Sequence, residues 1–235
     1  MRTHEAVLRR IEADLARGEL RIGGRLPPER TLAEQLGVSR ASVREAIRVL
    51  EAMGVVRSSV GSGPEAGTVV VGDPAAPLSA ALRLHLGTRA LPIHDLVEAR
   101  VLLETWAVAT AAEAPERAAA DLARAEELLV AMDDEALPPE RFHYLDAEFH
   151  VALAAAAGNV LVTAVMVALR EAVHGYVMAA VPALPDWPGT ARRLRGEHRE
   201  LVRAVRAGEA GPAASAVRAH IEGFTAEAGL VVVPG

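Results

Sequence analysis

The sequence contains no cysteine, so disulfides, thiolate metal sites and cysteine nucleophiles are excluded. Lysine is also absent, and all 25 basic residues are arginines. Aromatic residues make up only 3% of the 235 residues, whereas apolar residues in general make up 51%. An Ala- and Leu-rich chain with so few aromatic side chains favours helices over strands, and it can bury a sizeable core. We therefore expect a mostly α protein.

The sequence also lacks an uncharged apolar run long enough to span a membrane, because charged residues interrupt every apolar segment before it reaches about 18 residues. The first residues, MRTHEAVLRRIEADLARG, carry charges throughout and lack the apolar segment of a secretion signal. These two features predict a cytoplasmic protein with no membrane partner.

Charge is distributed unevenly along the chain. Residues 1–72 hold eleven arginines against nine carboxylates (+2), and residues 73–235 hold fourteen against twenty-two (−8), which together give the net charge of −6. A basic first third joined to an acidic remainder is compatible with nucleic-acid contact in the first third.

The first third predicts three helices followed by a β-hairpin. The first helix has apolar residues at helical spacing and ends at Gly18, the second covers 29–36, and the third covers 40–53 behind Ser39 as a candidate N-cap. Two β-branched runs at 55–60 and 68–71 flank the glycine-rich segment GSGPEAG. This order is typical of a winged helix-turn-helix, although two helices joined by a turn are also an ordinary helical hairpin.

Arginines occupy one side of the third predicted helix. Arg40 and Arg44 are four residues apart, with Ser42 between them, and Arg30 begins the preceding helix. Arginine reads guanine edges and grips phosphates, and a helix N-terminus itself attracts phosphate. A solvated Arg/Glu face is the alternative for the spacing alone. The order of helices and wing favours DNA contact.

The rest of the chain predicts only helices. After a linker at 73–77, helical patterns occupy 78–86, 93–113, 115–132, 138–157, 159–181, 188–208 and 211–229, separated by Pro and Gly. Seven helices over this length predict a bundle-like domain.

A possible metal site is encoded within these helices. Asp146 and His150 are four residues apart and share a helix face, while His198 and His220 lie on two later helices among apolar neighbours. One carboxylate and three imidazoles could hold a divalent cation. The sequence alone does not show that the four side chains meet in the folded protein. For Asp146 and His150, an ordinary hydrogen bond within one helix is the alternative.

The segment LPPERTLAEQLGVSRASVREAIRVLEAMGVV (26–56) resembles the signature of the GntR family of bacterial winged-helix regulators. The resemblance implies that Arg30, Arg40 and Arg44 contact DNA, with Ser39 and Ser42 beside them and Gly61 at the tip of the wing. Two features depart from the family pattern: Ala41 stands where a hydroxyl residue is frequent, and the wing is longer and lacks an aromatic residue.

The remainder resembles the all-helical FCD effector domain of the FadR-type branch, in DLVEARVLLE (95–104), LDAEFHVALAAAAGN (145–159), GEHRELVRAVRAGE (196–209) and AVRAHIEG (216–223). This resemblance implies that Asp146, His150, His198 and His220 are metal ligands, for a zinc-, nickel- or manganese-type ion. It further implies an organic acid effector on the open side of the metal, clamped by Arg100. Arg100 could instead pair with Glu104. Asn159 could line the same pocket or cap a helix.

These features predict a mostly α protein with a winged helix-turn-helix domain at 1–72, a linker at 73–77 and a seven-helix effector-binding and dimerisation domain at 78–235. The predicted function is a homodimeric, ligand-responsive regulator that binds double-stranded operator DNA and is released from it by a small carboxylate. Two alternatives remain at this point. One is a metal-dependent hydrolase, and the other is a DNA-binding protein with a purely structural helical domain.

Overall fold

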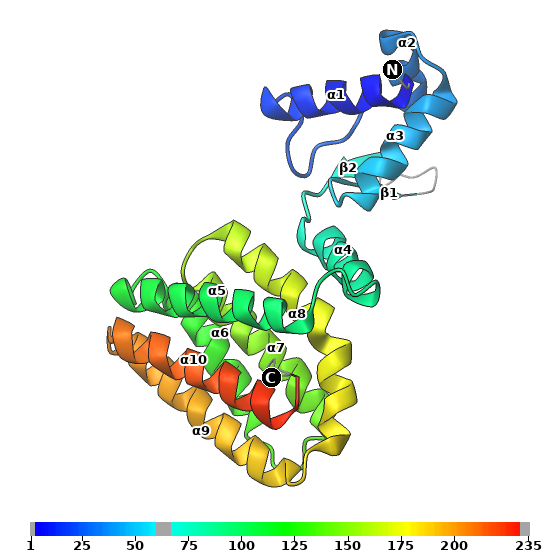
Figure 1. Ribbon diagram of the computed structural model, residues 1–235. Helices are drawn as coiled ribbons and strands as arrows, with labels where there is room; N and C mark the ends of the chain where they lie inside the picture. The colour runs from blue at the N-terminus through cyan, green and yellow to red at the C-terminus, as the bar shows by residue number, and fades with distance from the viewer. Residues whose placement is uncertain (1–2, 60–66, 231–235) are drawn as a thin grey trace. The chain divides into compact units, whose positions relative to one another are not determined.

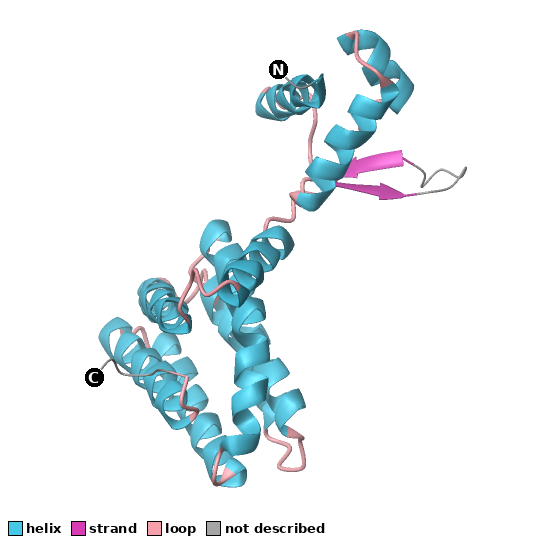
Figure 2. Cartoon of the chain, turned by 45° about the vertical axis from the view of Figure 1, so that its right-hand side comes forward, coloured by secondary structure: helices cyan, strands magenta, loops and turns pink. Residues whose placement is uncertain are grey.

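The computed structural model describes residues 3–59 and 67–230, without the side chains of Thr3 and Ala183. Its elements confirm the mostly α expectation (Figures 1 and 2). In chain order they are α1 (Thr3–Ala16), α2 (Glu29–Leu36), α3 (Arg40–Ala52), β1 (Val56–Ser59), β2 (Gly67–Val70), α4 (Ala75–Gly87), α5 (Ile93–Glu113), α6 (Ala119–Met132), α7 (Pro139–Ala155), α8 (Val160–Ala180), the 3-10 helix η1 (Val181–Ala183), α9 (Trp187–Arg206) and α10 (Ala210–Glu227).

The chain divides into two units, Met1–Leu78 and Ser79–Gly235, called here the winged-helix unit and the helical unit. In the winged-helix unit, α1, α2 and α3 precede an antiparallel β1–β2 pair in which Val56 faces Val70. The apolar sides of these elements form one core, which includes Val7, Val43 and Leu50. Arg25 adds a bridge to Val69 that the sequence did not predict.

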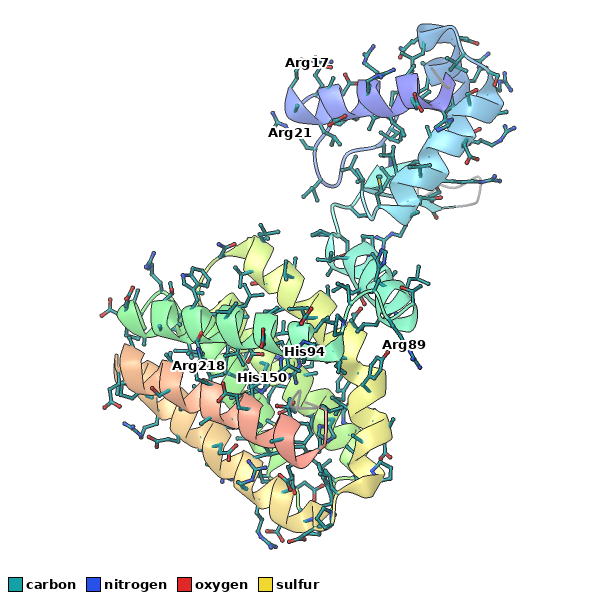
Figure 3. The ribbon with its side chains drawn as sticks, in the orientation of Figure 1. Arg17, Arg21, Arg89, His94, His150 and Arg218 are labelled. Carbon is teal, nitrogen blue, oxygen red and sulfur yellow. The ribbon has the colours of Figure 1, made fainter. Side chains whose placement is uncertain are left out.

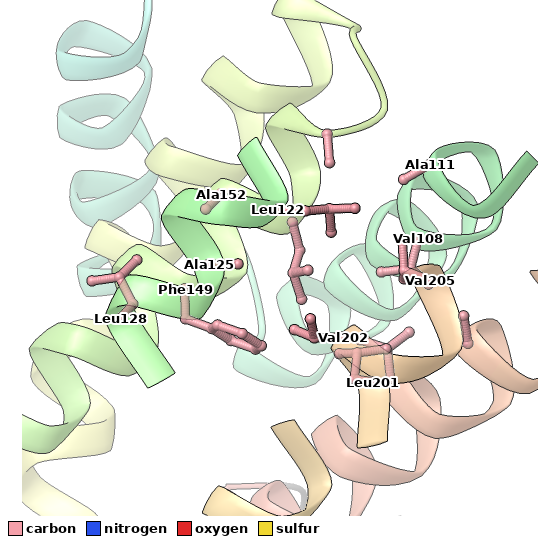
Figure 4. Packing of buried hydrophobic residues seen from close by; sticks show 14 of the residues in the cluster. Val108, Ala111, Leu122, Ala125, Leu128, Phe149, Ala152, Leu201, Val202 and Val205 are labelled. Carbon is pink, nitrogen blue, oxygen red and sulfur yellow. The ribbon is translucent and has the colours of Figure 1, made fainter. Parts of the chain in front are cut away.

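The helical unit contains most of α4 and all of α5 to α10, with α5 beside α10 and α6 beside α7 (Figure 1). Its main core draws on α5, α6, α7, α9 and α10, and Figure 4 shows Leu122, Phe149, Leu201 and Val205 packed within it. A second cluster joins α8 to α5 and α7 through residues such as Met166 and Ala154. Dense packing of this kind holds the polar side chains that point inward in fixed positions.

Two predicted boundaries differ from the structure. α4 begins at Ala75, so the expected linker at 73–77 is largely helical, and the division between the two units falls inside α4. Pro77 is tolerated there because the first turn of a helix needs no backbone donors. The helix expected from 115 begins at Ala119, because the residues before it form turns.

α8 is the one helix, among the residues described, that is long and apolar enough to cross a membrane by length and composition. Arg170 and Glu171 interrupt its apolar run, so α8 was not expected from the sequence to span a membrane. Arg170 is buried and forms an ion pair with Asp146 of α7, and Met166, Ala168 and Leu169 are buried in the protein. We therefore interpret α8 as a packing helix of the helical unit.

Candidate functional site

The N-terminus of α3 is the candidate DNA-reading surface. Ser39 caps the helix, because its Oγ accepts a hydrogen bond from the backbone N–H of Ser42 at 3.1 Å. Val43 and Ile47 are buried in the core of the unit, which turns the opposite side of the helix to solvent. Arg40 and Arg44 lie on that exposed side, as their spacing predicted.

The arginines of this surface form only loose ion pairs. Arg44 Nη1 lies 3.6 Å from Glu29 Oε2, and Arg30 Nε lies 3.9 Å from Glu34 Oε1. The Arg44 side chain is 52% exposed and that of Arg30 is 70% exposed, so these pairs are worth little and can be exchanged for phosphates. Gly61, predicted at the tip of the wing, lies outside the described residues.

The four predicted metal ligands meet inside the helical unit (Figure 3 labels His150 there). His150 Nε2 and His198 Nε2 lie 3.1 and 3.3 Å from Nε2 of His220. Asp146 Oδ1 lies 3.1 Å from His198 Nε2 and 3.6 Å from His150 Nε2. All four residues are buried, and one ligand atom from each lies within 4.8 Å of the others.

This arrangement fits a divalent metal ion. Metal–ligand bonds of about 2.1 Å place adjacent ligand atoms roughly 3.0 to 3.4 Å apart in octahedral or tetrahedral geometry. The separations of 3.1, 3.3, 3.1 and 3.6 Å are close to that range. Three imidazole nitrogens and one carboxylate oxygen also form a donor set that suits zinc, nickel or manganese.

Two carboxylates orient the imidazoles of His150 and His220 through Nδ1, the ring nitrogen that does not face the other ligands. The buried Glu104 of α5 is hydrogen-bonded to His150 Nδ1, and Glu197 Oε2 lies 2.8 Å from His220 Nδ1. Both contacts require protonated Nδ1 atoms, which leaves the lone pair of each Nε2 for a metal. Within the described residues, His198 Nδ1 has no hydrogen-bond partner, and the ring of His198 packs on Phe149 at 4.5 Å between centroids.

Two buried arginines complete the centre. Arg170 of α8 forms an ion pair with Asp146 Oδ2, and Arg100 Nε donates a hydrogen bond of 2.8 Å to Glu104 Oε1. The predicted pairing alternative for Arg100 is therefore present. Arg100 also lines a cavity next to Asp146 and His220, so the same guanidinium is within reach of a small ligand.

Burial and ion pairing set the charges of the cluster. Burial alone would raise the pKa of Asp146, but Arg170 and the nearby imidazoles hold the pKa of this carboxyl well below its usual value. Burial lowers the pKa of His198 to about 4 and also lowers the pKa of His220. At neutral pH the carboxylate is ionised and these imidazoles are neutral, which is the state that metal binding needs.

Asn159 is placed differently from the other predicted effector residue. Its Oδ1 accepts hydrogen bonds from the backbone N–H groups of Leu161 and Val162, at 3.1 and 3.2 Å, at the start of α8. Its side chain is therefore a helix cap, and Asn159 is not among the residues that line the cavity. The capping alternative describes these contacts, and the effector role of Asn159 stays a prediction.

The residues behind the ligands were not predicted from the sequence. Glu104 was considered only as a partner of Arg100, and Arg170, Glu197 and His143 were given no role in the site. A visible signal existed for Arg170, because a charged residue in the middle of the apolar segment VTAVMVALREAV is rarely buried without a partner. No comparable signal marks Glu197, which lies in a helix rich in charge.

Comparison with known proteins supports both halves of this description. The family "Bacterial regulatory proteins, gntR family" matches residues 3–65, and the FCD domain family matches residues 95–223. The chain is similar to the HTH-type transcriptional regulator LutR of Bacillus subtilis, at 32% identity over 87% of this chain and 91% of the relative. It is also similar to the HTH-type transcriptional repressor NanR of Salmonella newport, at 32% identity over 94% and 84%.

Among solved structures, a GntR protein of Streptococcus agalactiae superposes with a TM-score of 0.69 at 25% identity, covering 95% of this chain and 98% of that one. The hydrolase alternative gains no support, since both matched families are those of regulators. The chain therefore belongs to the gntR family of bacterial regulatory proteins, in the branch that carries an FCD domain, and is a ligand-responsive, DNA-binding transcriptional regulator.

Proposed function

We propose that this regulator is a homodimeric repressor that holds a divalent metal ion on Asp146, His150, His198 and His220, and that a small carboxylate bound beside the metal releases it from its operator. The observation that carries the proposal is the convergence of these four side chains, from three helices, on one point. Repression is proposed because NanR, named a repressor, is similar along 94% of this chain.

The charge balance of the centre favours an anionic effector. The buried arginines, Arg100 and Arg170, are matched in charge by Glu104 and Asp146, and burial lowers the pKa values of His198 and His220, which favours their neutral forms. A divalent cation then adds two positive charges in a buried environment, where unpaired charge is costly. A carboxylate that contacts both the metal and Arg100 compensates part of that charge, and guanidinium can bind it with two hydrogen bonds.

Dimerisation rests on a separate observation. Leu102 and Trp106 are one helical turn apart on α5 and are 67% and 44% exposed. Adjacent exposed apolar side chains of this size are typical of protein–protein contacts. Each protomer of a dimer would read one half of a pseudo-palindromic operator. The effector acts only through unequal affinity for the DNA-bound and free states.

The test is operator binding by the purified protein, followed by fluorescence anisotropy with DNA from its own upstream region. We expect specific, salt-sensitive binding that a short carboxylic acid weakens at least tenfold in the metal-loaded protein. EDTA treatment and the His150→Ala substitution should both abolish the response to the acid. His94→Ala serves as the control, because the His94 side chain is about half exposed at the start of α5. Operator binding that neither metal nor any acid alters would overturn the proposal.

A further inference from the structure

A metal ion can reach the four candidate ligands only through the protein, because none of them is more than 9% exposed. The cavity beside them, called here the inner cavity, has a volume of about 30 Å³, which is room for an ion or a few water molecules. One atom of a residue in its wall, Nε2 of His143, is buried and has no hydrogen-bond partner among the described residues. The inner cavity is thus a small chamber, and its contents must enter from a larger space.

A larger cavity, called here the outer cavity, lies between α7 and α8 and has a volume of about 300 Å³. α7 contributes residues three or four apart from Tyr144 to Val151, and α8 contributes residues at the same spacing from Val167 to His174. Arg83 of α4 forms one more part of the lining. Tyr144 and Arg83 are both about half exposed, so the outer cavity is in contact with solvent.

One layer of side chains separates the two cavities. Ala147, Arg170 and His174 line both of them, so these three residues form the wall between the inner and the outer cavity. Ala147 contributes only a methyl group to this wall. Arg170 is bonded to Asp146, a candidate metal ligand, and His174 is exposed. A short displacement of these side chains would therefore join the solvent-facing space to the metal centre.

The charges along this path suit a divalent cation. Glu148 and Glu171 bring two exposed carboxylates to the outer cavity, and Glu171 forms only a loose ion pair with Arg83, at 3.8 Å. His174 follows in the wall, and Asp146 is a ligand that lies beyond it. Carboxylates attract cations, and both carboxylates and imidazoles can replace the water molecules around a metal ion. A cation therefore meets suitable groups from the solvent to the centre.

We propose that the outer cavity is the entrance of the metal centre, through which a divalent cation passes between α7 and α8 to Asp146 and His220. This inference rests on the proposed metal site and adds its route of loading. The competing route runs past Glu197, whose side chain is 31% exposed and contacts His220. An ion pair closes that route, because Arg193 Nη1 lies 2.6 Å from Glu197 Oε1, whereas the wall at Ala147 is only a methyl group.

Kinetics distinguish a passage from a ligand. Narrowing a passage raises the same barrier for entry and exit, so loading and release slow together and the equilibrium affinity stays the same. Ala147→Leu fills the wall between the cavities, and Val167→Phe narrows the outer cavity away from the ligands. Ala155→Leu is the matched control, because Ala155 is a half-buried alanine of α7 that lines neither cavity. Arg193→Ala opens the competing route.

The experiment uses zinc and the full-length protein. Zinc release is timed after the zinc-loaded protein is mixed with an excess of a chromophoric chelator, at chelator concentrations that no longer change the rate. Zinc affinity comes from equilibrium competition with the same chelator. The rate constant of loading is then the rate constant of release divided by the dissociation constant.

We expect Ala147→Leu and Val167→Phe each to slow zinc release and zinc loading roughly tenfold, with unchanged affinity. Ala155→Leu and Arg193→Ala should load zinc as fast as the wild-type protein. Unchanged loading rates in both cavity variants, equal slowing in Ala155→Leu, or faster loading in Arg193→Ala would overturn the entrance and leave the metal site standing. A wild-type protein that does not bind zinc would overturn both.

Discussion

The buried carboxylate of Glu104 contacts Nδ1 of His150, and this contact turns Nε2 of the same ring toward Asp146 and His220. Glu104 is itself held by Arg100, which also lines the adjacent cavity. The residue that we expect to clamp the effector is therefore two hydrogen bonds away from a metal ligand. Ligand binding and metal binding should influence each other through this chain of contacts.

Replacement of Glu104 by Gln should weaken metal binding. The amide has the shape of the carboxylate but lacks its charge, so it no longer makes His150 more basic. Partners of this kind contribute roughly 10- to 100-fold to metal affinity. The measurement is the zinc affinity of Glu104→Gln and of the wild-type protein, determined by competition with a chromophoric chelator. The control is Glu126→Gln, which removes an exposed carboxylate paired with Arg206. Unchanged zinc affinity in Glu104→Gln would show that this contact does not support the site.

Metal-free protein should lose stability as the pH falls from 7 to 4. Folding lowers the pKa of His198 from 6.5 to about 4, so between these values the unfolded state binds more protons and is favoured as pH decreases. The expected loss is up to about 3 kcal/mol for His198 alone. Below about pH 4.5, Glu104 and Asp146 act in the same direction, because folding lowers their pKa values as well.

Urea unfolding of EDTA-treated protein, followed by tryptophan fluorescence, measures this pH dependence. Both tryptophans, Trp106 and Trp187, lie in the helical unit, so the signal reports on that unit alone. His94→Gln should leave the profile unchanged because His94 is exposed. A free energy of unfolding that stays constant between pH 7 and 4 would contradict the burial of neutral histidines.

Truncation of the α3 arginines should weaken operator binding with little effect on stability. Arg40→Ala and Arg44→Ala each remove an exposed guanidinium from the DNA-reading surface. Loss of one base or phosphate contact is worth about 1 to 3 kcal/mol, so we expect affinity to fall roughly 10- to 100-fold at fixed salt. Arg218→Ala on α10 is the matched control, since Arg218 is exposed and paired with Glu222. If Arg40→Ala, Arg44→Ala and the control Arg218→Ala all bind the operator with the same affinity, the DNA contact does not lie at the start of α3.

Two variants of Asn159 distinguish a helix-capping role of this residue from a role in effector binding. Asn159→Ala should destabilise the helical unit by about 1 kcal/mol, because two backbone N–H groups lose their acceptor. Asn159→Asp should preserve stability, since aspartate also caps helices. Affinity for a short carboxylic acid, measured by titration with tryptophan fluorescence as the signal, should be the same in both variants if the residue only caps α8. An alanine variant that folds normally but no longer binds the acid would support the effector role.

Local sequence signals predicted much of the architecture. Gly37 marks the end of α2 and Ser39 the start of α3, and the spacing of Val43, Ile47 and Leu50 identifies the buried face of α3. Asp146 and His150 share a helix face for the same geometric reason. The start of α4 was less predictable, because Pro77 suits either a linker or a first helical turn.

Long-range contacts explain what could not be predicted. The meeting of Asp146 with Arg170 depends on how α7 packs against α8, and no spacing within one helix encodes it. Likewise, His143 and Trp187 lie on different helices and meet only after folding. A buried histidine looks the same in the sequence as an exposed one, so the missing hydrogen bond of His143 became visible only in three dimensions.

The most direct test of the central claim is the metal content of the purified protein, measured by inductively coupled plasma mass spectrometry after dialysis. We expect about one divalent zinc-, nickel- or manganese-type ion per chain in the wild-type protein. In His150→Ala combined with His220→Ala the ion should be absent, while the helical content by circular dichroism stays near that of the wild type. A wild-type protein that holds no metal, even after incubation with zinc, nickel and manganese in turn, would show that Asp146, His150, His198 and His220 do not form a metal site.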